Sequence, residues 1–128
     1  MTSSISTALL LIAHGSRRQE ANDDLDHLAE QLRGRGLYAM VQPSFLELSR
    51  PTIAEGGTIC VERGVKRVVL LPYFLSAGVH ARDDMMTARD ELAARFPDVE
   101  FLLAQPLGRH PSMLDVVIQR AEEAGLPL

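Results

Sequence analysis

The sequence predicts an α/β domain in which a four-stranded parallel sheet is flanked by helices. Four apolar, strand-like runs begin about thirty residues apart, near Ala8, Tyr38, Arg67 and Val99. A helical pattern follows each run, and this alternation favours parallel strands joined by helices. Residues 68–71 are apolar throughout, as expected of a strand that is buried on both faces.

The first two helices are predicted from apolar spacing and from the residues at their ends. After the first strand, apolar residues recur at i, i+3, i+4 and i+7, and two glycines follow as a stop. These residues are Leu25, Leu28, Ala29 and Leu32, followed by Gly34 and Gly36. Pro51 suits the first turn of the second helix, which ends near Gly64. That helix carries the apolar residues Ile53, Ile59 and Cys60.

The last two helices show the same kinds of signal. The third starts near His80 and ends at Pro97, with Asp83 and Asp84 in its first turn, where negative charge suits the helix dipole. Its inward residues are Met85, Leu92 and Phe96. The fourth starts near Pro111 and stops at Gly125. We expect it to bury Leu114, Val117, Ile118 and Ala121.

Length and composition are typical of one soluble domain. The 128 residues suffice for a single core, so we expect one domain over residues 1–128, with 46% hydrophobic and 23% charged residues. A net charge of -4 argues against a broad nucleic-acid or anionic-membrane surface. The single cysteine, Cys60, excludes an internal disulfide and a cysteine-based zinc site. The first apolar run is too short for a secretion signal or a membrane span, so we expect a cytoplasmic protein.

Two histidines are expected at one edge of the sheet. A flavodoxin-like, doubly wound sheet of this size takes the strand order 2-1-3-4, which makes the first and third strands neighbours. His14 follows the first strand directly, and His80 follows the third after a short loop. Two converging imidazoles suit a divalent transition metal or a proton-transfer step. Taken singly, each histidine is more typical of a loop residue next to a helix end, and only the two together favour a site.

Further candidate residues are expected at the same carboxyl edge. Glu47 leaves the second strand there, where a carboxylate could complete a metal shell, carry protons or simply cap a helix. Gly78 would let a flat ligand approach the backbone or would only make a turn. An apolar wall beside it would come from Leu75, Ala77 and Val79.

Five arginines are expected in loops at this rim or one residue past them. Guanidinium groups suit carboxylates. The five are Arg17, Arg18, Arg50, Arg82 and Arg109. His110 reaches the same rim and is most simply a helix-start residue, whereas His27 falls on the polar side of the first helix. Met85 and Met86 are expected to pack in the core or at the rim.

The motifs at these positions resemble those of the class II tetrapyrrole chelatases, in particular the short sirohydrochlorin chelatases. The resemblance covers the chain from Ala8 to Ala121, with the motifs in the family's order. They are Leu-Leu-Ile-Ala-His14-Gly-Ser-Arg, Phe45-Leu-Glu-Leu, Pro51-Thr-Ile, Leu71-Pro-Tyr-Phe-Leu-Ser-Ala-Gly-Val-His80 and Pro106-Leu-Gly-Arg-His-Pro111.

The resemblance implies a lyase-class enzyme that inserts a divalent metal into sirohydrochlorin or a close relative. It implies that His14 and His80 hold the metal, which is a substrate, and that His14, with Glu47 as a second candidate, accepts the pyrrole protons. Cobalt is the first expectation, with iron and nickel next. The macrocycle would be lined by Leu75, Ser76, Ala77, Gly78, Val79 and His80.

The resemblance also implies that Arg50 faces the substrate, although the family often has an acidic residue at that position. Longer relatives carry two such domains, and short ones pair as homodimers, which we expect here. We expect no nucleotide or organic cofactor, because the chain lacks a Gly-x-x-x-x-Gly-Lys loop.

Three other functions fit the sequence less well. A metal or tetrapyrrole carrier would use the same histidines without turnover. A phosphohistidine enzyme would need an arginine where Ala13 precedes His14 and Gly15. A flavodoxin-like signalling domain would need an acidic cluster after the first strand, and none is present there.

Overall fold

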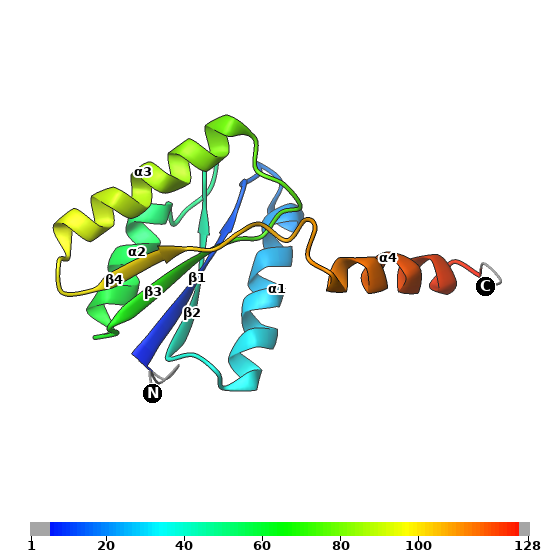
Figure 1. The fold of residues 1–128 in the computed structure, drawn as a ribbon, viewed down its shortest axis with the longest axis horizontal. Helices are drawn as coiled ribbons and strands as arrows, with labels where there is room; N and C mark the ends of the chain where they lie inside the picture. Colours follow the sequence, from blue (N-terminus) through cyan, green and yellow to red (C-terminus); the bar gives the residue numbers. More distant parts are fainter. Residues whose placement is uncertain (1–5, 126–128) are drawn as a thin grey trace.

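The computed structural model describes residues 6–125 and contains a parallel sheet with the strand order β2-β1-β3-β4 (Figure 1). Strands and helices alternate along the chain, so the predicted fold and strand order are confirmed. The elements are β1 (Thr7–Ala13), α1 (Gln19–Arg35), β2 (Met40–Phe45), α2 (Ile53–Glu62), β3 (Arg67–Pro72), α3 (Val79–Arg95), β4 (Glu100–Leu103) and α4 (Ser112–Glu123).

The strand register brings three loops to the same edge of the sheet. Ala13, the last residue of β1, is paired with Phe45 at the end of β2, and Ile12 is paired with Pro72 at the end of β3. Because all the strands are parallel, the loops that follow β1, β2 and β3 leave from this carboxyl edge. Ligands of open α/β sheets bind at such an edge, between the strands where the chain order reverses.

The core consists of two apolar layers on either side of β1. On one face, Leu25 and Ala29 of α1 pack with alternate residues of β1. On the other face, residues of α2 and α3 pack with the remaining ones, including Ile53, Cys60, Met85 and Leu92. The inward residues predicted for these helices are therefore largely confirmed, except that Ile59 is 40% exposed.

Helix α2 begins at Ile53, two residues after Pro51, so Pro51 lies just before the helix and not in its first turn as predicted. Thr52 is its N-cap, and its hydroxyl accepts a hydrogen bond from the Glu55 N–H at 3.2 Å. The Glu55 carboxylate in turn accepts a hydrogen bond from the Thr52 N–H at 2.9 Å. This reciprocal capping box satisfies two backbone donors that the first turn leaves unpaired.

Two further predictions about burial are wrong. No residue of α4 is buried, although four were expected to be. Strand β3 alternates between buried and half-buried residues, so only one of its faces is fully covered. Both differences have one cause, since α4 extends away from the sheet instead of packing on it (Figure 1).

Within residues 6–125, the structure contains no helix with the length and apolar character needed to cross a membrane.

Candidate functional site

His14 lies immediately beyond β1, and its main chain continues the pairing with the second strand. The N–H of Leu46 donates to the Ala13 carbonyl at 2.9 Å, and the N–H of Glu47 donates to the His14 carbonyl at 3.1 Å. The loops after β1 and β2 therefore run side by side. The backbones of His14 and Glu47 therefore lie at the same edge of the sheet, as predicted.

Gly15 makes this close approach possible, and sequence reasoning gave it no role. Its φ is +95°, and a Cβ atom built on it would lie 1.8 Å from the carbonyl oxygen of Glu47. Any other residue would have to displace the loop that carries Glu47. A glycine directly after a strand-end histidine was the signal available in the sequence.

A buried asparagine ties the same two loops together. The Asn22 side chain accepts a hydrogen bond from the Ser16 N–H at 3.0 Å and donates to the Ser16 carbonyl at 2.8 Å. It also donates to the Ser49 hydroxyl at 3.3 Å. Asn22 is 5% exposed, so these bonds also satisfy a buried amide. It was missed because a polar residue in a helix gives no local sign of a distant partner.

The His14 ring rests on an aromatic ring from the third strand's loop. The ring centroids of His14 and Phe74 are 4.4 Å apart, with an angle of 30° between the planes. The Tyr73 N–H donates to the Ile12 carbonyl at 2.7 Å, which holds this loop against β1. Stacking engages the face of the exposed imidazole and leaves the ring edge, where both nitrogens lie, for a ligand or a proton.

His80 lies in the first turn of α3, one residue later in the helix than predicted. Gly78 is the N-cap, Val79 is the first helical residue, and His80 follows it with its side chain exposed. Because α3 begins there, Asp83 and Asp84 fall after the first turn, not within it. The helix leaves from the loop after β3, beside β1, so both histidines lie beyond the carboxyl ends of neighbouring strands.

The described residues hold no complete metal site. Between residues 6 and 125, no group of three or more His, Cys, Asp or Glu side chains could hold a metal ion. His14, His80 and Glu47 therefore do not form a preassembled three-ligand shell. Cys60 is buried, and its burial raises the pKa of the thiol to about 12, which removes it as a thiolate ligand.

Two adjoining hollows lie beside the loops that follow β3 and β4. Their volumes are about 220 Å³ and about 290 Å³, and they share Ala77, Arg82, Gln105 and Pro106. Leu75 and Ser76 line the second hollow, so three residues of the predicted substrate stretch border this space. Gln105 has no counterpart among the predicted residues.

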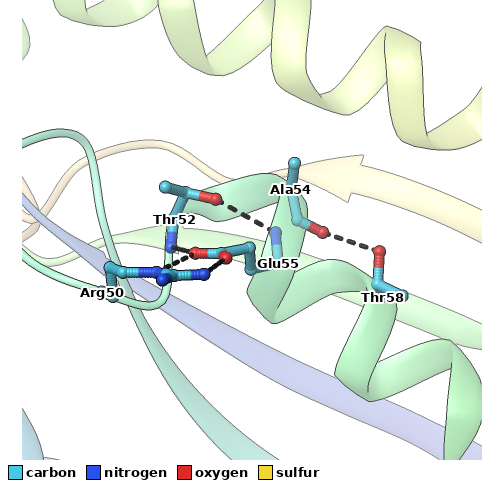
Figure 2. Close-up of polar contacts among 5 residues, drawn as sticks. All are labelled: Arg50, Thr52, Ala54, Glu55 and Thr58. Carbon is cyan, nitrogen blue, oxygen red and sulfur yellow. Dashed lines mark hydrogen bonds and ion pairs between the residues drawn. The ribbon is translucent and has the colours of Figure 1, made fainter.

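The five predicted rim arginines separate into three groups. Arg82 lies in the first turn of α3, not in a loop as expected, and lines both hollows, whereas Arg109 lines the larger one. Arg17 and Arg18 are exposed before α1. Arg50 is paired with Glu55 at the start of α2, with Nε 3.2 Å from Oε1 and a second contact between Nη2 and Oε2 (Figure 2).

The pairing of Arg50 with Glu55 is a local helix-end contact. The Arg50 hydrogen bond and the Thr52 N–H lower the pKa of Glu55 to about 2, and Glu55 raises the pKa of Arg50. The guanidinium thus already has a carboxylate partner within the chain. The sequence did not indicate that Glu55 would compete with a substrate for Arg50, because Glu55 is five residues away and lies in helix α2.

The remaining candidates lie close to where they were expected. His110 accepts a hydrogen bond from the Ser112 N–H at 3.1 Å through its Nδ1 atom, as a helix-start residue would. His27 is exposed on α1. Met85 is buried, and Met86, 39% exposed, lines the smaller hollow.

Comparisons with known proteins match almost the whole chain. A family model described as CbiX matches residues 8–124. The chain is 35% identical over 114 residues to the chloroplastic sirohydrochlorin ferrochelatase of Arabidopsis thaliana, covering 89% of this chain and 51% of that protein. It is 30% identical to the sirohydrochlorin cobaltochelatase of Methanopyrus kandleri, covering 91% of this chain and 96% of that protein.

A solved structure of SirB from Bacillus subtilis with Fe3+ has a similar fold. The TM-score is 0.84 at 29% identity, covering 94% of this chain and 48% of that chain. The chain thus spans about half the length of several relatives it matches and nearly the full length of others.

Proposed function

The chain belongs to the CbiX family, and from this premise we propose that it inserts a divalent metal into sirohydrochlorin or a closely related tetrapyrrole. Cobalt and iron are favoured, because relatives are named cobaltochelatase and ferrochelatase. Nickel also accepts imidazole nitrogen and is the third candidate. The observation that carries the proposal is the exposed His14 ring, stacked on Phe74 at the carboxyl edge where such sheets bind ligands.

The metal is a substrate that His14 and His80 hold only briefly. A site with few protein ligands leaves the other coordination positions to water or to the incoming macrocycle. The lack of a third protein ligand among the described residues suits such a transfer better than a permanent metal centre. The ion passes from imidazole nitrogens to pyrrole nitrogens as the ring docks.

His14 is also the proposed proton acceptor. Insertion of a divalent ion displaces two protons from the pyrrole nitrogens, so a base must lie near the ring. An imidazole suits this role near neutral pH. Glu47 is the second candidate, because its backbone is bonded to that of His14.

The hollows beside the loop after β3 are proposed to hold the edge of the macrocycle. Leu75, Ser76 and Ala77 border them and continue through Gly78 and Val79 to His80. Arg82 and Arg109 line the same space, and guanidinium groups bind carboxylates through paired hydrogen bonds. Arg50 is a weaker candidate for binding the substrate, since its guanidinium is already hydrogen-bonded to the Glu55 carboxylate.

We further propose that two chains pair and that the protein works in the cytoplasm. Relatives of about twice this length match it over a single half, so a second copy would supply the equivalent of the other half. We expect this lyase-class chelation to need no nucleotide and no organic cofactor, since the sequence has no Gly-x-x-x-x-Gly-Lys loop.

The test is metallation of metal-free sirohydrochlorin by cobalt, followed through the absorption spectrum. His14→Ala and His80→Ala should each slow the reaction about a hundredfold, the scale of losing a positioned base or ligand. His27→Ala is the matched control, because His27 is an exposed histidine on α1. Both site histidines are exposed, so circular dichroism should show an intact fold in every variant.

Two outcomes would contradict the proposal. Wild-type rates in either site variant would remove that residue from its role. A spectral change on binding without faster metallation would instead identify a tetrapyrrole carrier.

A further inference from the structure

Within residues 6–125, two residues other than glycine have a left-handed backbone. They are Leu48 and Arg109, each with φ +64°. This conformation favours glycine or asparagine, and a bulky residue that adopts it is strained. Such strain persists where the surroundings hold the backbone, and it clusters at functional sites. Leu48 lies in the loop after β2 and Arg109 in the loop after β4, so both lie at the carboxyl edge of the sheet.

The backbone on both sides of Leu48 is held by contacts with other segments. The Glu47 N–H donates to the His14 carbonyl at 3.1 Å. The Glu47 carbonyl, which begins the peptide bond to Leu48, lies so close to Gly15 that a Cβ there would be 1.8 Å from its oxygen. After the turn, the Ser49 hydroxyl accepts a hydrogen bond at 3.3 Å from the buried side-chain amide of α1. These contacts fix the left-handed turn beside His14.

The turn leaves the Leu48 side chain in water. Its exposed fraction is 56%, although leucine is among the residues most often buried. Glycine or asparagine would suit the same turn without strain. An exposed leucine is common by itself, but an apolar side chain that is both strained and exposed indicates a surface that a ligand covers.

Exposed apolar side chains lie on both sides of His14. Strand β1 lies between β2 and β3, so His14 lies between the loop that carries Leu48 and the segment that joins β3 to α3. In that segment Leu75 is 62% exposed, and Val79 at the start of α3 is 74% exposed. Neighbouring strands are about 4.8 Å apart, so a ring that is wider than this and centred over His14 extends over both neighbours.

A planar tetrapyrrole matches this arrangement. Its faces are apolar, its carboxylates lie at the periphery, and the metal enters at its centre. A ring centred over His14 would meet Leu48 on one side and Leu75 with Val79 on the other. Arg109, the second strained residue, lines the larger hollow, where a guanidinium suits a peripheral carboxylate.

We propose that Leu48 contacts the macrocycle and, together with Leu75 and Val79, holds it centred over His14. Leu48 is then a substrate-binding residue from the loop after β2, on the side of His14 opposite the predicted substrate stretch. This role rests on the proposed tetrapyrrole chemistry, but it concerns one side chain and can fail while that chemistry stands.

Leu48→Asn tests this role, because asparagine adopts the left-handed conformation readily and removes the apolar side chain. Rates of cobalt insertion into sirohydrochlorin should show a KM for the macrocycle raised about tenfold, the scale of one lost apolar contact, with little change in kcat. The affinity for cobalt without the macrocycle should not change. The Tm should not fall, because the backbone strain is relieved.

Two variants complete the test. Leu48→Met restores an apolar side chain of similar size, so its KM for the macrocycle should return close to the wild-type value. Leu37→Asn is the matched control, because Leu37 is 53% exposed but lies between α1 and β2, at the opposite edge of the sheet. Leu37→Asn should leave both KM and kcat unchanged.

Three results would overturn the role of Leu48 in distinguishable ways. If Leu48→Asn keeps the wild-type KM while the unmodified protein metallates sirohydrochlorin, Leu48 does not contact the macrocycle and the proposed function stands. If Leu48→Asn lowers the Tm and weakens cobalt binding as well, the residue only supports the loop. If the unmodified protein neither binds nor metallates sirohydrochlorin, the proposed function and the role of Leu48 fail together.

Discussion

The two halves of the sheet differ in how completely they are covered. Strand β1 is buried along almost its whole length, with α1 on one face and α2 and α3 on the other. Strands β3 and β4 are covered on one face only. The difference shows that a helix following a strand in sequence covers the sheet only if its connecting loop turns it back.

The same difference appears in the loops at the carboxyl edge. The loops after β1 and β2 are joined to each other by backbone hydrogen bonds and by the buried Asn22. The loop after β4 is joined to the loop after β3, and this contact sends α4 outward. One pair of loops therefore builds the surroundings of His14, and the other determines where the last helix goes.

The largest expected effect compares a core leucine with its counterpart on the uncovered side. Leu10 is fully buried, so Leu10→Ala should lower the free energy of unfolding by about 3 kcal/mol through lost burial and a cavity. Leu102→Ala should cost about 1 kcal/mol or less in a single chain, because Leu102 is 42% exposed. Urea unfolding measures both.

Protein concentration provides a further test of the comparison between Leu10→Ala and Leu102→Ala. If a second copy covers β4, the loss of unfolding free energy caused by Leu102→Ala should grow as the concentration rises. If Leu10→Ala and Leu102→Ala lower the free energy of unfolding equally at low concentration, the described difference in coverage between β1 and the β3–β4 half of the sheet is contradicted.

A smaller effect is expected from the loop that carries His14. Gly15→Ala should lower the free energy of unfolding by about 2 kcal/mol, because alanine is strained at φ +95° and its Cβ would meet the Glu47 carbonyl. It should also slow metallation, since the Glu47 loop must move. Unfolding in urea and the absorption assay measure the two effects.

Gly34→Ala is the control for the Gly15 prediction. Gly34 lies in α1 with no atom within 4 Å of a built Cβ, so alanine there should raise stability by about 0.5 kcal/mol. A destabilisation similar to that of Gly15→Ala would show that the close approach to Glu47 is not the cause.

The smallest effect concerns the ion pair at the start of α2. The pKa of Glu55 is lowered from 4.5 to about 2 in the folded chain, chiefly by the Arg50 hydrogen bond. Its stabilising contribution is therefore present above about pH 4.5 and is lost as the pH falls through about 2. The exposed position of the pair keeps this contribution small.

Glu55→Gln should accordingly lower the Tm slightly at neutral pH and converge with the unmodified protein in acid. Thermal unfolding between pH 7 and pH 2 measures the difference. Glu62→Gln removes a charge from the other end of α2 and is the matched control. A Tm difference for Glu55→Gln that stays constant across the pH range would contradict the role of the ion pair.

The candidate site was only partly predictable from the sequence. His14 and Glu47 were placed at one edge because strand ends can be located from apolar runs. Phe74 and Asn22 were missed, since their partners come from other loops and leave no periodic signal. Arg50 was expected to face a substrate, whereas a carboxylate of the next helix holds it.

The sequence by itself determined the number, type and order of the strands and helices, because each depends on apolar spacing and end signals within a few residues. The register that brings three loops to one edge follows from these elements and from the rule for parallel connections. Only the tertiary structure decided that the His14 ring stacks on Phe74 and that α4 leaves its own sheet uncovered. Both depend on contacts between loops distant in sequence, where a single hydrogen bond or close approach of a glycine changes the direction of the chain.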